Sequence, residues 1–153
     1  MDFGVVRLMI KVNVVCVGKI KEEFYRQAVE EYRKRLSRFC KTEVIEIAEG
    51  KNTEEEGKAI LRSAKGFKIA LCIEGKKSDS LSLASKVKTL CDRGEEITFI
   101  IGSSCGLSEQ VKEQADFRLS FSDMTFPHQL MRVILFEQIY RSFMINSGSE
   151  YHK

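Results

Sequence analysis

The chain has 153 residues, enough for one domain with a real hydrophobic core. Apolar residues make up 43% and charged residues 31%, and the net charge is only +3, an ordinary globular balance. This composition alone does not indicate a nucleic-acid-binding protein, but it leaves room for a local basic face. With five cysteines in no C-x-x-C spacing and two histidines, we predict neither a zinc site nor a disulfide framework, and no metal at all.

The N-terminal residues carry charges and do not resemble a signal peptide. No run approaches the roughly 20 apolar residues that a membrane span needs. We therefore expect a cytoplasmic protein without membrane contact. Because Met9 opens the first strand-like run, residues 1–8 are interpreted as a possible N-terminal extension of a single domain that covers 1–153.

Hydrophobic periodicity divides the chain into alternating strands and helices. The predicted elements, in chain order, are a strand at 10–17, a helix at 21–38, a strand at 42–48, a helix with Thr53 as N-cap reaching 64, a strand at 68–73, a helix beginning at Ser80 or Ser82 and ending near 94, a strand at 97–101, a short helix at 108–114, a weaker strand at 117–121, and a helix from Pro127 to about 145. Several of these strands are apolar throughout. The pattern predicts an α/β fold, a mostly parallel sheet with helices on both faces.

Ligands in such sheets bind at the carboxyl ends of the strands. Three segments should meet there: the loop after Ile73, the loop 102–106 and the segment 122–126. The loop Gly102-Ser103-Ser104-Cys105-Gly106 contains glycines that allow close backbone approach to a ligand. It matches neither common phosphate-binding motif, so an ordinary strand-to-helix turn is the alternative interpretation.

The final helix is apolar on nearly all sides. Its apolar residues are Leu130, Val133, Ile134, Leu135, Phe136, Ile139, Tyr140, Phe143 and Met144. Such a helix in a small domain predicts burial on the sheet and also against a second copy of the chain, a homodimer. The alternative is a helix wedged into its own core.

The last 35 residues, LSFSDMTFPHQLMRVILFEQIYRSFMINSGSEYHK, closely resemble the end of the ribosomal RNA large subunit methyltransferase H family, which belongs to the SPOUT class. The stretch VNVVCVGKIKEEFYRQAVEEYRKRL and the loop IGSSCGLS fit the same family, so the resemblance covers 10–153. It implies a C-terminal deep trefoil knot, an exception to the rule against knots. It also implies methyl transfer from S-adenosylmethionine to N3 of a pseudouridine in 23S ribosomal RNA, by a homodimer acting on the assembled ribosome.

The resemblance also assigns site residues. The cofactor-binding residues are Leu71, Gly102, Ser103, Ser122, Asp123, Met124, Thr125, Phe126 and Pro127. The catalytic residues are Tyr151, His152 and Arg141, of which the tail residues reach the cofactor of the partner protomer. His152 is a candidate general base or base-orienter, since histidine changes charge near neutral pH. Tyr151 would stack on or hydrogen-bond to the flipped base, and Arg141 would hold a phosphate or shape the site.

Lys153, Arg35 and Arg38 are the RNA-binding candidates. The cations around the first helix outnumber its acids and could grip phosphates, although an ordinary solvated helix face explains them equally well. Ser103 departs from the family, which has a second glycine there. This departure is the only feature in favour of the alternative function, a knotted RNA- or ribosome-binding protein with weak or lost cofactor binding, and the intact YHK tail argues against that alternative. Without the resemblance, a flavodoxin-like or nucleotide-binding module is a further alternative.

Overall fold

The computed structural model describes residues 9–153, so the possible extension at 1–8 lies outside the described residues. Strands and helices alternate along this part of the chain, which confirms the predicted α/β class. The strands are β1 (Lys11–Val17), β2 (Lys41–Ile47), β3 (Phe67–Lys77), β4 (Ile97–Ile101) and β5 (Phe117–Ser120). The helices are α1 (Glu23–Leu36), α2 (Thr53–Ser63), α3 (Ser80–Asp92), α4 (Glu109–Gln114) and α5 (His128–Asn146).

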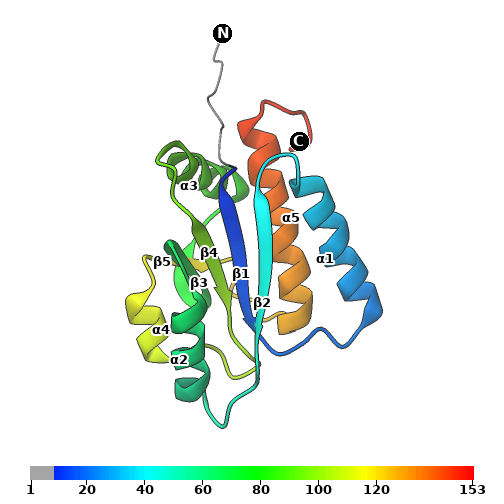
Figure 1. The fold of residues 1–153 in the computed structure, drawn as a ribbon. Helices are drawn as coiled ribbons and strands as arrows, with labels where there is room; N and C mark the ends of the chain where they lie inside the picture. The colour runs from blue at the N-terminus through cyan, green and yellow to red at the C-terminus, as the bar shows by residue number, and fades with distance from the viewer. Residues whose placement is uncertain (1–8) are drawn as a thin grey trace.

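The strands form one five-stranded parallel sheet in the order β2-β1-β4-β3-β5. Side chains alternate across it, as strand geometry requires. Along β1, Val12, Val14 and Cys16 join the core with α1, α3 and α5, while Val15 and Val17 pack with α2 and α4. Helices therefore cover both faces, as predicted, and the sheet lies between the two helical layers (Figure 1).

The start of helix α2 differs from the prediction by one residue, whereas helix α3 starts at one of the two predicted positions. Helix α2 begins at Thr53, and its N-cap is Asn52, whose side chain accepts a 2.8 Å hydrogen bond from Glu55 N. Helix α3 begins at Ser80 and is capped by Asp79, which accepts from Ser82 N at 2.7 Å. Asn52 therefore takes the N-cap position predicted for Thr53, and Asn is at least as good an N-cap as Thr.

Strand β3 is longer than predicted, because it runs to Lys77 instead of ending at Ile73. Its pairing with β5 shifts register: Leu71 and then Lys76 both lie opposite Leu119. An irregularity of this kind inserts extra residues without ending the strand. At Gly75 a Cβ atom would lie 2.8 Å from the carbonyl carbon of Arg118, so the close strand contact requires glycine there.

Helix α5 packs against α1 and α3 and contributes the largest group of buried side chains of any helix. The predicted helix began at Pro127, whereas Pro127 is the N-cap residue of α5 and the helix itself begins at His128. On the other side of α5, Leu130, Val133, Ile134 and Met144 are only half-buried in the single chain. Within residues 9–153, no helix is long and apolar enough to cross a membrane.

Candidate functional site

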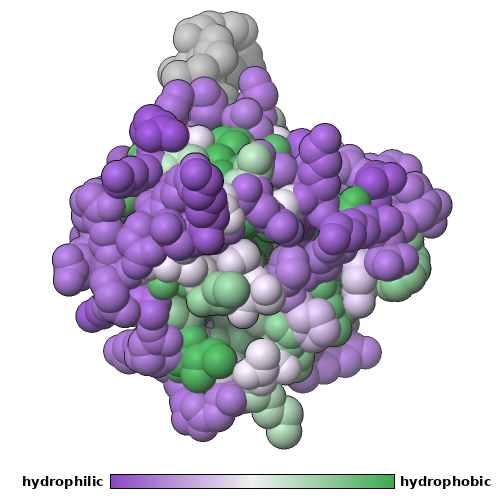
Figure 2. All heavy atoms as spheres, turned by 90° about the horizontal axis from the view of Figure 1, so that it is seen from below, coloured by the Kyte–Doolittle hydropathy of each residue, from purple (hydrophilic) through white to green (hydrophobic). Residues whose placement is uncertain are grey.

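A cavity of about 550 Å³ opens at the carboxyl edge of the sheet. Its wall comes from the middle of β3, from the loop after β4, and from the segment that joins β5 to α5. Figure 2, seen from this edge, shows neutral and apolar side chains around a hollow, framed by hydrophilic ones. The volume lies in the range of pockets that bind cofactor-sized molecules, which are mostly apolar with a few polar groups.

The predicted cofactor-binding residues line this cavity with one exception. Those on the wall are Leu71, Gly102, Ser103, Ser122, Met124, Thr125, Phe126 and Pro127. Asp123 is not on the wall: its side chain is 72% exposed and pairs with Lys77. The backbone turn explains the difference. Met124 N donates to Ser122 Oγ at 3.0 Å, a tight local bend that turns the intervening side chain outward.

The loop after β4 is compact. A Cβ atom on Gly102 would lie 2.5 Å from Gly106 O, so only glycine fits at this position. Ser103, the departure from the family pattern, turns its hydroxyl toward α2. Its Oγ donates to Glu56 Oε1 at 3.2 Å and accepts from Cys105 N at 3.3 Å. The serine side chain is thereby held by a buried carboxylate, since Glu56 is 6% exposed.

Several cavity residues were missed by the sequence reasoning. They include Phe121, His128 and Met131. Met131 lies one helical turn after Pro127 and donates its backbone N–H to Pro127 O at 2.9 Å. The i to i+4 spacing from Pro127 places both residues on one side of the helix start, and this spacing was the available signal.

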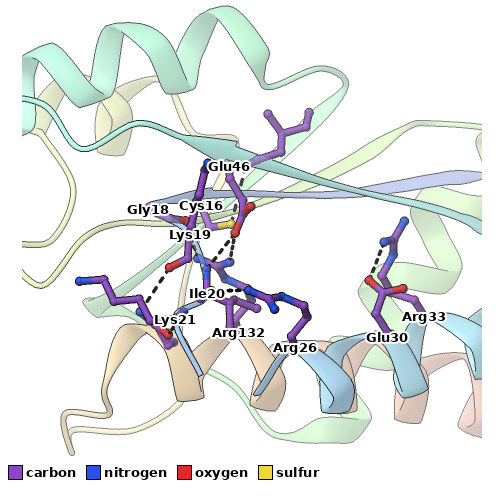
Figure 3. A network of polar contacts seen from close by, with 12 residues as sticks. Cys16, Gly18, Lys19, Ile20, Lys21, Arg26, Glu30, Arg33, Glu46 and Arg132 are labelled. Carbon is purple, nitrogen blue, oxygen red and sulfur yellow. Dashed lines mark hydrogen bonds and ion pairs between the residues drawn. The ribbon is translucent and has the colours of Figure 1, made fainter. Parts of the chain in front are cut away.

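A buried arginine anchors the first turns of α5. Arg132 is 1% exposed; its Nη1 donates to Glu46 Oε2 at 2.8 Å and its Nη2 donates to Gly18 O at 3.1 Å. The same Glu46 oxygen accepts from Ile20 N at 3.1 Å (Figure 3). This ion pair and the hydrogen bond to Gly18 therefore tie β2, the end of β1 and the first turns of α5 together. They fix where the segment 122–127 enters the helix.

The catalytic candidates meet in a second place, which we call the tail cluster: Arg35, Glu137, Tyr140, Arg141, Tyr151 and His152. Arg141 donates to Glu137 Oε1 from Nε at 2.7 Å and from Nη2 at 2.6 Å. Its Nη1 lies 3.1 Å from His152 Nδ1. The Tyr151 ring lies under the Arg141 guanidinium at 4.8 Å and packs edge-on against Tyr140 at 5.1 Å.

Of the RNA-binding candidates, Arg35 belongs to the tail cluster, where its guanidinium lies 5.8 Å from the Tyr140 ring. Arg38 is one turn away and stacks over Phe39 at 4.5 Å. Lys153 is exposed. On α1 itself, Arg35 also pairs with Glu31 at 3.1 Å, so part of the predicted positive excess is neutralised within the helix.

The tail cluster and the cavity are separate places on one chain. His128 borders the cavity and Arg141 belongs to the cluster. Arg141 lies 13 positions after His128 on α5, which corresponds to a rise of about 20 Å along the helix. Figure 1 shows α5 running from the cavity edge toward the opposite edge, with the C-terminus beside its far end. None of the tail cluster residues lines the cavity. A single chain therefore does not join the two halves of the predicted site.

The cysteines differ in burial, and burial changes the pKa of their thiols. Burial raises the pKa of the Cys40 thiol to about 12, and burial raises the pKa of Cys16 to about 11 despite the nearby Arg132 charge. Cys105 is exposed and lies in the loop after β4. In residues 9–153, no three His, Cys, Asp or Glu side chains gather as metal ligands would.

Comparison with known proteins agrees with this architecture. A family model described as "Predicted SPOUT methyltransferase" matches residues 10–152. A solved structure described as a "probable methylase family protein" from Haemophilus influenzae superposes with a TM-score of 0.55 at 10% identity, covering 90% of this chain and 66% of that one. This similarity supports the fold alone.

Two curated relatives carry the same name. The ribosomal RNA large subunit methyltransferase H proteins of Clostridioides difficile and of Bifidobacterium animalis subsp. lactis are each 46% identical to this chain. Each alignment covers 94% of this chain and 100% of the relative. The chain therefore belongs to the SPOUT methyltransferases, and within them to the ribosomal RNA large subunit methyltransferase H family.

Proposed function

We propose that this protein transfers a methyl group from S-adenosylmethionine to N3 of a pseudouridine in 23S ribosomal RNA. It acts as a homodimer on the assembled ribosome, in the cytoplasm. The observation that carries the proposal is the cavity at the carboxyl edge, lined by nearly all of the residues that the family resemblance assigns to the cofactor. The names of the relatives support a large-subunit ribosomal RNA substrate.

The cavity suits the cofactor chemically. Leu71, Leu107 and Phe126 offer apolar surface for adenine, while Ser122 and Thr125 bring hydroxyls and backbone groups for the polar part. The Gly102 backbone permits close approach, and Ser103 turns its hydroxyl toward Glu56. S-adenosylmethionine would supply an electrophilic methyl group, and no metal is needed for its transfer.

The separation of the cavity from the tail cluster supports the homodimer. If the half-buried stripe Leu130, Val133, Ile134 and Met144 meets the same stripe of a second copy, α5 of each protomer lies at the interface. The tail of one protomer then reaches the cavity of the other, as the family resemblance implies. Met124, a rim residue that is 73% exposed in the single chain, would be covered by the partner or by RNA.

In this composite site the tail residues face the RNA. Tyr151 stacks on or hydrogen-bonds to the extruded base, and His152 and Arg141 act on the base or its phosphate. Arg35, Arg38 and Lys153 contact the RNA backbone. The trefoil knot belongs to the same proposal, since the cavity is built from loops at the C-terminal end of the sheet, where the family places it. The alternative, a knotted ribosome-binding protein with weak cofactor binding, rests on Ser103 alone.

The test is transfer of labelled methyl from S-adenosylmethionine to ribosomes that lack this modification. Isolated subunits and free RNA are parallel substrates. We expect label in large-subunit RNA of the assembled ribosome, and loss of label when 151–153 are deleted. A matched control is Lys88→Ala, on an exposed part of α3 whose side chain is 61% exposed. A folded protein that binds the ribosome but transfers no label would support the binding-only alternative.

A further inference from the structure

The contact between Arg141 and His152 defines which imidazole nitrogen carries the proton. Arginine has five N–H donors and no acceptor, so Arg141 Nη1 must be the donor in its 3.1 Å contact with His152 Nδ1. Nδ1 is then the unprotonated acceptor, and the ring proton of neutral His152 lies on Nε2. The tautomer follows from the hydrogen-bond partner, as it does for most histidines in proteins.

Glu137 fixes the arginine that makes this contact. Both Nε and Nη2 of Arg141 donate to Glu137 Oε1, one helical turn before it, at 2.7 and 2.6 Å. The other oxygen, Oε2, is buried and has no hydrogen-bond partner within residues 9–153, so this carboxylate is engaged by Arg141 alone. The two side chains are 19% and 25% exposed, which keeps the pair partly shielded from solvent.

The surroundings of His152 leave Nε2 as its free end. Tyr151 is held under Arg141, and Asp79 lies within electrostatic reach. The pKa of Asp79 is lowered mainly by the hydrogen bonds that its carboxylate accepts from Ser82. No hydrogen bond to Nε2 is present in residues 9–153. The imidazole ring of His152 therefore presents an N–H group, not a lone pair, to the nucleobase of the RNA substrate.

We propose that Glu137, Arg141 and His152 form a relay in which Glu137 is a positioning residue and His152 is an Nε2–H donor to the target base. The proposal rests on the proposed function and narrows the role of His152 within it. N3 of the pseudouridine loses its proton to solvent, and its freed lone pair forms the new N–C bond. The S–C bond breaks, and sulfur keeps that electron pair. Nε2–H donates to the carbonyl oxygen next to N3, where the negative charge of the deprotonated base is shared.

This assignment differs from general-base catalysis at Nε2. A base must offer a lone pair to the N3 proton, whereas a neutral ring held by Arg141 at Nδ1 carries a hydrogen at Nε2. A donor, unlike a base, is replaceable by a side chain that has an N–H but cannot accept a proton. Glutamine provides such a group at nearly the same reach, because its amide nitrogen lies as far along the side chain as Nε2 does.

The first readout does not depend on activity. In the full-length homodimer labelled with ¹⁵N, long-range ¹H–¹⁵N spectra recorded above neutral pH resolve the ring nitrogens of His128 and His152, the two histidines of the chain. The His152 signals are assigned by their loss in His152→Gln. We expect an acceptor shift at Nδ1 and a protonated Nε2 in wild type and in Glu137→Gln, whose amide oxygen still accepts from Arg141. Glu137→Leu should move both shifts toward averaged values. A protonated Nδ1 in the wild type would overturn the relay.

The second readout is methyl transfer to ribosomes. We expect His152→Gln to keep kcat within about tenfold of wild type, while His152→Ala loses about a hundredfold, the lower end of what a proton-handling group contributes. Glu137→Leu should lower kcat and leave KM for S-adenosylmethionine unchanged, and Glu137→Gln should restore most of the loss. Equal loss in His152→Gln and His152→Ala would refute the donor role. An inactive wild type with the expected spectrum would refute the proposed function but not the tautomer.

Discussion

The composite site makes a quantitative prediction about mixed dimers. One variant, Gly102→Val, removes the cavity, because its Cβ would lie 2.5 Å from Gly106 O and 2.7 Å from the Gly106 carbonyl carbon. The other variant ends at residue 150 and so lacks Tyr151, His152 and Lys153. Each homodimer should be inactive, since one lacks the cavity and the other lacks the tail. Neither defect can be repaired within its own chain, since the tail residues do not line the cavity that they would complete.

Mixing the two variants in equal amounts, with subunit exchange, should restore activity. Random association makes half of the dimers mixed, and each mixed dimer pairs one intact cavity with the one intact tail of its partner. One of its two sites is then complete and the other is doubly defective. The expected activity is about one quarter of wild type.

The assay is labelled methyl transfer to unmodified ribosomes, compared before and after subunit exchange. Circular dichroism and size-exclusion chromatography establish that each variant is folded and dimeric. Activity near one quarter, which rises and falls with the mixed-dimer fraction, supports the site shared between protomers. If the mixture contains mixed dimers but is as inactive as its components, the shared site is refuted. The tail would then act on the cavity of its own chain.

Three further predictions concern single side chains. Arg132→Met should lower the free energy of unfolding, measured by urea titration, by about 3 kcal/mol, because the arginine is 1% exposed and its contacts with Glu46 and Gly18 are lost. The control Lys88→Met removes an exposed ion pair and should lower it by under about 0.5 kcal/mol. Equal values would show that the buried pair contributes little. Ser103→Ala should lower the free energy of unfolding by about 1–3 kcal/mol, because a buried oxygen of the Glu56 carboxylate loses its hydrogen-bond donor. The affinity for S-adenosylmethionine, measured by calorimetry, should stay within about threefold of wild type. A complex that is about tenfold tighter at unchanged stability would contradict this prediction. Thiol labelling at neutral pH, followed by mass spectrometry, should modify the exposed Cys105 first and Cys40 only after unfolding. The reason is that burial raises the pKa of Cys40 to about 12, and the thiolate is the reactive form. Equal labelling rates of the two cysteines in the native protein would contradict this prediction.

Local patterns were enough to predict the type and order of every element between residues 9 and 153. Apolar runs in β1 and β4 are buried in full because parallel strands are covered on both faces. The errors lie at element ends. Asn52, and not Thr53, caps α2, and β3 passes Ile73 because its partner strand continues beside it. Such ends depend on contacts with distant parts of the chain, which periodicity does not encode.

The sequence by itself determined the chemical character of the cavity segments, since glycine at 102 and the run Met124–Pro127 carry their backbone preferences wherever they are placed. Only the tertiary structure decided which side chains face the cavity. Asp123 turns out to Lys77, and Met131 turns in. Only the tertiary structure separated the tail cluster from the cavity of its own chain, and brought Arg141 to Nδ1 of His152. The physical reason is that these relations join residues on different elements, and the packing of α5 against α1 and α3 sets their distances.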